Sequence, residues 1–267
     1  MTKPALIAVV GPTGTGKSDL AIKIAHALAA SGRTAEIVNS DAMQLYRGMD
    51  IGTAKLSVAA RAGVVHHLID VYPVTKESTA ADYQLLARPL IGQLHESEKV
   101  PILVGGSMLY LAAVLNNFEF PGRNPDLRAE LEGELLNIGP EALHEKLAAL
   151  DPTAASRIEP KNGRRIVRAL EIIAVTGKPF AAALPETPSS WQPVLQIGLN
   201  GQRSLLVERL NRRVLNMWQQ GLVDAAQQGQ QFWVLGNVDA VTARLCHHVQ
   251  GQLAFALGGD HRGAVEA

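Results

Sequence analysis

Hydrophobic residues in the first part of the chain form short runs that end at glycines. Residues 5–10 read ALIAVV before Gly11, and residues 100–104 read VPILV before Gly105. Short, continuous apolar runs are typical of strands buried on both faces of a parallel sheet. Similar patterns predict further strands at 36–41, 68–71 and 194–199.

Helical periodicity separates these expected strands. In residues 17–30, Leu20, Ile24 and Leu28 fall on one stripe, which predicts a helix with one buried side. Helices are also expected at 80–96, 108–115 and 204–220. Strand, loop and helix in repeated order predict an α/β fold with a right-handed, doubly wound parallel sheet.

A second pattern begins after Asn116. Residues 121–125 are rich in breakers, and helical periodicity without a convincing strand follows from 126 to 177. Two leucine faces are expected, formed by Leu127, Leu131 and Leu135 and by Leu143, Leu147 and Leu150. We therefore expect a first part of the core at 1–118, a helical insertion domain at 119–190, and a return to the core at 191–267.

Composition limits the class of protein. The 267 residues are 47% hydrophobic and 19% charged, so the chain is globular rather than disordered. Lys+Arg and Asp+Glu both number 25, so any basic surface for a polyanionic partner must be local. The lone Cys246 excludes a disulfide framework and a multi-cysteine metal site. No apolar run approaches the ~18 residues of a membrane span, so we expect a cytoplasmic protein that does not bind membranes. We also expect a monomer.

Residues 11–18 carry the first chemical motif, a P-loop. Gly11, Pro12, Thr13, Gly14, Thr15, Gly16, Lys17 and Ser18 satisfy G-x-x-x-x-G-K-[ST] between a predicted strand and a predicted helix. The glycines let successive amides point inward, Lys17 supplies a mobile cation, and Ser18 is placed to hold Mg²⁺ between phosphate oxygens. The motif predicts a P-loop fold that binds a phosphate chain, but it does not identify the molecule that carries the phosphates.

Asp41 marks a second region of chemistry. It follows the second predicted strand, so it lies at the edge of the sheet where doubly wound folds bind their ligands. Taken alone, an aspartate at this point is a magnesium ligand, a general base or a capping residue.

Four blocks of sequence, in chain order, resemble the tRNA dimethylallyltransferases. They are the P-loop with residues 41–55 (DAMQLYRGMDIGTAK), residues 66–70 (HHLID), residues 103–110 (LVGGSMLY) and residues 164–171 (RRIVRALE). The resemblance as a whole runs over about the first 220 residues. The resemblance implies transfer of a dimethylallyl group from its diphosphate to the N6 amine of a tRNA adenosine beside the anticodon.

The resemblance also implies roles for individual residues. The P-loop would bind the diphosphate of dimethylallyl diphosphate rather than ATP, with Lys17, Ser18 and Mg²⁺ stabilising the leaving group. Asp41 would accept the proton of the attacking amine or orient it. The family's Asp-x-x-Gln pairing with the nucleobase corresponds to Asp41 and Gln44, with Ala42 and Met43 between them. The anticodon stem-loop of tRNA is the implied partner.

Other positions keep two interpretations. Ser107 stands where the family usually has threonine, and it is a tRNA contact, a helix N-cap or both. Arg128 is a tRNA contact or a solvated charge. Arg203 and Arg209 follow the last predicted strand, and the resemblance suggests that one or both face the diphosphate. Helical spacing alone would leave both arginines on the surface.

Basic residues are locally in excess in the expected insertion. Six of them lie between 157 and 178 against two acidic residues. This excess favours phosphate contacts by Arg164, Arg165 and Arg168 over a merely solvated face. The pair His66 and His67 suggests a metal site, but adjacent side chains on an extended segment point to opposite sides, so structural hydrogen bonding is favoured.

The C-terminal part departs from the family. The expected Ala-x-Gly-Tyr block and basic, aromatic terminal segment do not appear, and the pattern becomes irregular from about Gln228. A shifted reading frame is favoured over a divergent end, so we expect this segment to be poorly packed and to reduce activity.

Three other functions remain open at this point. A prenyltransferase that acts on free adenine nucleotides would not need the basic insertion. A P-loop small-molecule kinase would leave residues 46–50 (YRGMD) unexplained. A non-catalytic RNA-binding protein, which has lost its enzymatic activity through the altered C-terminal segment, is the third.

Overall fold

The computed structural model describes residues 6–118, 120–180 and 189–227. The chain divides into two compact units. We call Met1–Val114 together with Gln192–Ala267 the core unit, and Leu115–Trp191 the helical unit. The atypical segment from about Gln228, and with it the expected frameshift, lies outside the described residues.

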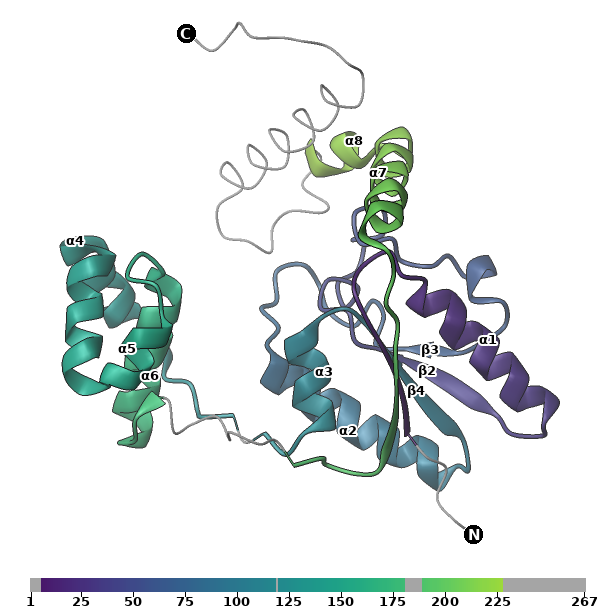
Figure 1. The fold of residues 1–267 in the computed structure, drawn as a ribbon, viewed down its shortest axis with the longest axis horizontal. Helices are drawn as coiled ribbons and strands as arrows, with labels where there is room; N and C mark the ends of the chain where they lie inside the picture. The colour runs from purple at the N-terminus through teal and green to yellow at the C-terminus, as the bar shows by residue number, and fades with distance from the viewer. Residues whose placement is uncertain (1–5, 119, 181–188, 228–267) are drawn as a thin grey trace, which may run out of the picture. The chain divides into compact units, whose positions relative to one another are not determined.

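The core unit is built on a five-stranded parallel sheet (Figure 1). Its strands are β1 (Leu6–Val10), β2 (Ala35–Asn39), β3 (His66–His67), β4 (Val100–Val104) and β5 (Val194–Gly198), in the order β3-β2-β4-β1-β5. After β4 the chain runs through the helical unit and returns as β5 on the other side of β1. The predicted doubly wound α/β fold is confirmed.

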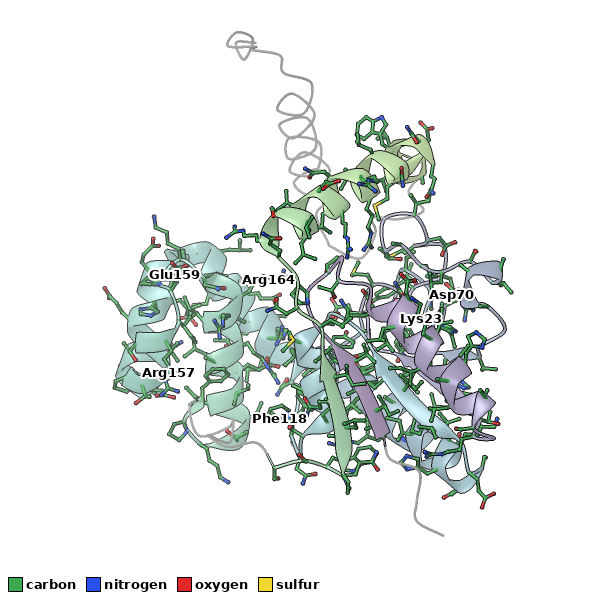
Figure 2. All side chains as sticks on the ribbon, turned by 45° about the vertical axis from the view of Figure 1, so that its right-hand side comes forward. Lys23, Asp70, Phe118, Arg157, Glu159 and Arg164 are labelled. Atoms are coloured by element: carbon green, nitrogen blue, oxygen red, sulfur yellow. The ribbon has the colours of Figure 1, made fainter. Side chains whose placement is uncertain are left out.

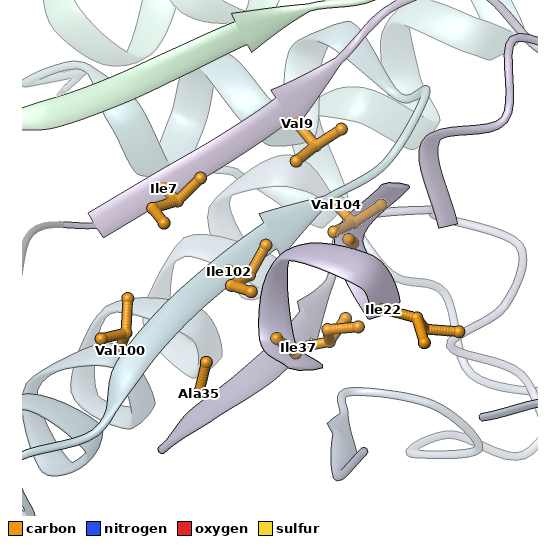
Figure 3. Close-up of a cluster of buried hydrophobic side chains, with 10 residues drawn as sticks. Ile7, Val9, Ile22, Ala35, Ile37, Val100, Ile102 and Val104 are labelled. Atoms are coloured by element: carbon orange, nitrogen blue, oxygen red, sulfur yellow. The ribbon is translucent and has the colours of Figure 1, made fainter. Parts of the chain in front are cut away.

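The helices of the core unit are α1 (Lys17–Ala30), the short η1 (Ala59–Arg61), α2 (Ala80–Glu96), α3 (Met108–Leu115), α7 (Arg203–Gln219) and α8 (Leu222–Gln227). They cover both faces of this sheet, with α1 on one face and α2 and α3 on the other (Figure 1). Figure 3 shows the apolar cluster under α1, where Ile22 packs with sheet residues such as Ile37 and Ile102. Burying one such side chain contributes about 1.5–3 kcal/mol, so this cluster fixes α1 and the loop before it on the sheet.

Two expected strands differ from the structure. β2 ends at Asn39, so Asp41 lies in the loop that follows it. The strand expected at 68–71 is wrong, because the third strand is the shorter β3 at 66–67. Leu68 and Asp70 have φ values of 56° and 58°, a left-handed conformation that a strand does not allow. The apolar residues of this run therefore belong to a loop, where Ile69 lines a cavity.

The helical unit contains α4 (Pro125–Leu150), α5 (Pro152–Arg157) and α6 (Gly163–Thr176). A kink at Gly139, where φ is 83°, divides α4 just before Pro140. Leu131, Leu143 and Leu147 of α4 pack against α6 in one apolar cluster, whereas Leu150, expected on the same face, is 55% exposed. Within the described residues, no helix of either unit is long and apolar enough to cross a membrane.

Candidate functional site

The P-loop connects β1 to α1 at the carboxyl end of the sheet. Gly16 occupies the N-cap position of α1 with φ 86°, a conformation that favours glycine. No side chain caps this helix, although Thr79 caps α2 and Asn162 caps α6. The first amides of α1 are therefore left without a side-chain cap, an arrangement that helix N-termini use to bind anions.

Lys17 lies within this loop. Its Nζ donates to the carbonyl oxygens of Gly11 at 2.9 Å and Pro12 at 2.8 Å. Burial lowers the pKa of Lys17 below its ordinary 10.5, Asp41 opposes this effect, and Arg213 adds to it. Lys17 is thus within electrostatic reach of one carboxylate and a second cation.

A cavity of about 320 Å³ opens beside the P-loop. Its charged lining residues are Lys17, Asp19, Asp41, Arg209 and Arg213. Thr13, Gly14, Gly16, Ser18, Asn39, Gln44, Thr53, His66, Gly105 and Gly106 are among its other lining residues. The cavity therefore joins the P-loop to the loop that carries Asp41 and Gln44.

Asp41 is held by short contacts around the end of β2. One carboxylate oxygen, Oδ1, accepts a hydrogen bond from the amide of Met43 at 2.9 Å, and the Ser107 hydroxyl accepts one from the amide of Ala42 at 3.0 Å. A Cβ at Gly105 would lie 2.4 Å from the backbone of Ser40, so only glycine allows β4 to approach this loop so closely. Residues 41–44 are therefore fixed from two neighbouring strands.

The backbone carbonyl of Thr53 connects two elements of the cavity. Gln44 Nε2 donates to it at 3.1 Å, and Arg213 Nη2 donates to it at 3.2 Å. The same bond leaves Gln44 Oε1 as an acceptor for a ligand. Lys55 fixes this loop further, because its Nζ bonds to carboxylate oxygens of Asp50 and Asp70, each at 2.6 Å.

The position of Arg213 was not predicted from the sequence. It is half-buried on α7, one turn after Arg209, and burial lowers its pKa while Asp41 raises it. α7 packs closely against the P-loop. A Cβ added at Gly14 would lie only 3.3 Å from the side chain of Leu210. Arg203 is exposed and is not among the described residues that line the cavity. The sequence did carry one signal for Arg213: its i, i+4 spacing from Arg209 places both arginines on the same face of α7.

The basic residues expected to bind tRNA in the helical unit fall into two groups. Arg128 and Arg168 both form ion pairs with Glu171, whose side chain is fully buried, so a structural partner accounts for both arginines. Burial alone would raise the pKa of Glu171, but the hydrogen bonds from these arginines bring it below its ordinary 4.5. Arg164 and Arg165 are exposed; Arg164 is labelled on this unit in Figure 2.

The histidine pair is held by hydrogen bonds, as the sequence favoured. His66 Nδ1 lies 2.8 Å from the carbonyl oxygen of Val64, and His67 Nε2 lies 2.6 Å from Glu36 Oε2. The described residues contain no group of three or more His, Cys, Asp or Glu side chains that could hold a metal ion. The cavity does offer the hydroxyl of Ser18 and the carboxylate of Asp41, oxygen donors of the kind that Mg²⁺ shares with substrate phosphates.

Comparison with known proteins identifies the family. Residues 44–247 match the family model described as IPP transferase. A tRNA dimethylallyltransferase of Thermobifida fusca is 56% identical over 219 residues, which cover 82% of this chain and 68% of the relative. The chain belongs to the tRNA dimethylallyltransferase family. The resemblance seen in the four sequence blocks is confirmed, and the relatives are prenyltransferases by name, as predicted.

Further relatives of the family agree with this assignment. A tRNA dimethylallyltransferase of Salinispora tropica is 54% identical over 218 residues, covering 82% of this chain and 66% of the relative. The full-length tRNA isopentenylpyrophosphate transferase of Bacillus halodurans superimposes with a TM-score of 0.55 at 42% identity, covering 85% of this chain and 70% of that one. A eukaryotic dimethylallyltransferase acting on tRNA gives a TM-score of 0.72 at 27% identity, covering 86% and 56%. The chain thus spans about two thirds of the length of the curated relatives it matches.

Proposed function

We propose that this chain transfers a dimethylallyl group from dimethylallyl diphosphate to the N6 amine of a tRNA adenosine next to the anticodon. Family membership supports the reaction class. The observation that carries the proposal is that Asp41 lines the same cavity as the P-loop and the cations Lys17, Arg209 and Arg213. A carboxylate among phosphate-binding cations suits a reaction in which a proton and an anionic leaving group depart together.

The attacking amine needs help from a base. The lone pair of an adenine exocyclic amine is delocalised into the ring, so the amine is a weak nucleophile. In the proposed step, the nitrogen forms a bond to the allylic carbon while the bond from that carbon to the diphosphate oxygen breaks. Asp41 accepts the amine proton as the new bond forms. Gln44 Oε1 is left as an acceptor beside Asp41 and supports recognition of the base.

The leaving diphosphate gains negative charge as the allylic bond breaks. Lys17, Arg213 and the uncapped amides of α1 are the groups of this chain that would stabilise that charge. Lys17 would exchange its bonds to loop carbonyls for bonds to phosphate oxygens. The hydroxyl of Ser18 would hold Mg²⁺ with the phosphates, and the ion would neutralise part of their charge.

The experiment that tests this function offers competing acceptors to the purified chain. Labelled dimethylallyl diphosphate is incubated with unmodified tRNA or with AMP, in the absence of ATP. We expect label in the tRNA and one diphosphate released for each group transferred. Label in AMP would assign the chain to the free-nucleotide prenyltransferases. In a parallel incubation with added ATP, conversion of ATP to ADP in step with turnover would assign it to the kinases.

A further inference from the structure

The side chain of Asn39 forms hydrogen bonds with the backbone of Asp41, the proposed base. Asn39 is the last residue of β2 and is 5% exposed. Its Oδ1 accepts a hydrogen bond from the amide of Asp41 at 3.1 Å, and its Nδ2 donates to the carbonyl oxygen of the same residue at 3.2 Å. One amide side chain therefore fixes both polar backbone groups of Asp41.

Asn39 is itself fixed by two other elements. Its Nδ2 also donates to the carbonyl oxygen of Leu68 at 2.9 Å, which ties the loop after β3 to the loop after β2. The buried hydroxyl of Tyr83, on α2, donates to the backbone carbonyl of Asn39 at 2.6 Å. Because Tyr83 is 0% exposed, this bond anchors the end of β2 to the helix layer beneath the sheet.

These contacts determine how the carboxylate of Asp41 is presented. With the backbone of Asp41 fixed by Asn39, Oδ1 accepts from Met43, and no hydrogen bond to Oδ2 is formed by any of the residues that the structure describes. Oδ2 is thus the oxygen left for a proton from the substrate. Small errors in the position of a catalytic group are costly, because proton transfer requires hydrogen-bond distance in the reacting complex.

We propose that Asn39 is a positioning residue for Asp41 and that Tyr83 supports it from α2. The inference rests on the proposed function of Asp41 as the base. Asn39 also lines the cavity, but its amide is used within the protein, so its role is to hold Asp41 rather than to contact substrate. The inference predicts a defect in the chemical step that is separate from diphosphate binding.

The test compares Asn39→Ala, Asn39→Asp and Tyr83→Phe with a matched control, Val38→Ala. Val38 is the neighbouring residue of β2 and is fully buried, and its side chain has no hydrogen-bonding group, so its truncation weakens the core without removing a hydrogen bond to Asp41. Asn39→Asp preserves the shape of the side chain and the acceptor but removes the donor to Asp41 and Leu68. It serves as the second variant if Asn39→Ala does not fold.

Two measurements separate positioning from stability. At saturating tRNA and dimethylallyl diphosphate, we expect the single-turnover rate to fall about tenfold or more in both Asn39 variants and less in Tyr83→Phe. Binding of dimethylallyl diphosphate without tRNA should stay within about twofold of the parent. Val38→Ala should lower the denaturant midpoint but keep the parental rate. Folded Asn39 variants with the parental rate, or an equal loss of rate in Val38→Ala, would overturn the inference.

Hydrogen exchange distinguishes failure of this inference from failure of the proposed function. Exchange of the Met43 amide should accelerate at least tenfold in the Asn39 variants and remain near parental in Val38→Ala. If the parent modifies no tRNA, the proposed function fails while this result still decides whether Asn39 holds the Asp41 loop. Unchanged exchange at Met43 in the Asn39 variants would contradict the inference whatever the activity.

Discussion

Arg164 and Arg165 of α6 should contribute to the salt dependence of tRNA binding, whereas Arg168 of the same helix should not. The first two side chains are exposed, but Arg168 bonds to Glu171 and to the carbonyl oxygens of Pro121 and Gly122. Each contact between a basic side chain and a phosphate contributes about 0.7–0.9 to the slope of log affinity against log salt. The double variant Arg164→Gln/Arg165→Gln should therefore flatten the slope by about 1.4–1.8 units if both side chains meet phosphates.

Arg168→Gln should have the opposite pattern of effects. Removing one partner of a buried ion pair costs about 3–5 kcal/mol, and partial exposure of the guanidinium reduces our expectation to about 2–3 kcal/mol of unfolding free energy. The salt slope of tRNA binding should change by less than about 0.3 units. Arg33→Gln is the matched control, because Arg33 is exposed just before β2, at the end of the sheet opposite the cavity.

The assay is a tRNA binding titration at four or more salt concentrations, with the denaturant midpoint of each variant measured separately. Arg33→Gln should alter neither the slope nor the midpoint. An unchanged slope in the Arg164/Arg165 double variant would show that these arginines are only a solvated face. A slope flattened by Arg168→Gln without loss of stability would show that the pair with Glu171 opens when tRNA binds.

Four further predictions follow from the charged groups and the site. Lys17→Ala should weaken dimethylallyl diphosphate binding. Because the pKa of Lys17 lies below 10.5, the affinity of the parent should begin to decline at a pH below that value as Lys17 loses its charge. In a pH series, Lys17→Arg should move this decline to higher pH. Arg213→Ala should reduce the single-turnover rate more than Arg203→Ala, which serves as its control, and equal effects would remove Arg213 from the site. Because the pKa of Glu171 lies below 4.5, its stabilisation is complete above that pH and is lost as the pH falls through the lowered value, so Glu171→Gln should lower the denaturant midpoint at pH 7 and differ less from the parent in acid. A fluorescent adenine analogue at the target position should brighten on binding, because the target base must leave its stack to reach the cavity, at a cost of about a few kcal/mol. An unchanged signal at saturation would count against extrusion.

The sequence was most informative where burial imposes a regular pattern. β1 and β4 are apolar on both faces, so continuous runs revealed them, and α2 has the predicted bounds because Thr79 and Asp82 form a capping box at its start. The apolar run at 68–71 was misleading because the same kind of pattern indicates a strand. Its apolar side chains are partly buried in a loop, and apolar composition alone does not distinguish that environment from a strand.

The candidate site could be predicted only where its residues are contiguous in sequence. The P-loop and residues 41–44 are local motifs, and residues of both line one cavity: Thr13, Gly14, Gly16, Lys17 and Ser18 from the first, and Asp41 and Gln44 from the second. Arg213 bonds to a carbonyl 160 positions earlier in the chain, and Arg128 pairs with Glu171 across 43 positions. These long-range pairings depend on the tertiary fold, so charge patterns alone could not separate the arginines that line the cavity from those that pair with a buried carboxylate.

The rate of the chemical step in Asp41→Asn tests the central claim most directly. Asparagine keeps the oxygen that accepts from Met43 but cannot accept the amine proton in the same way. With saturating tRNA and dimethylallyl diphosphate, single-turnover transfer to the adenosine should fall by about 10²-fold or more, while diphosphate and tRNA affinities change little. A variant that modifies tRNA at nearly the parental rate would contradict the assignment of Asp41 as the base.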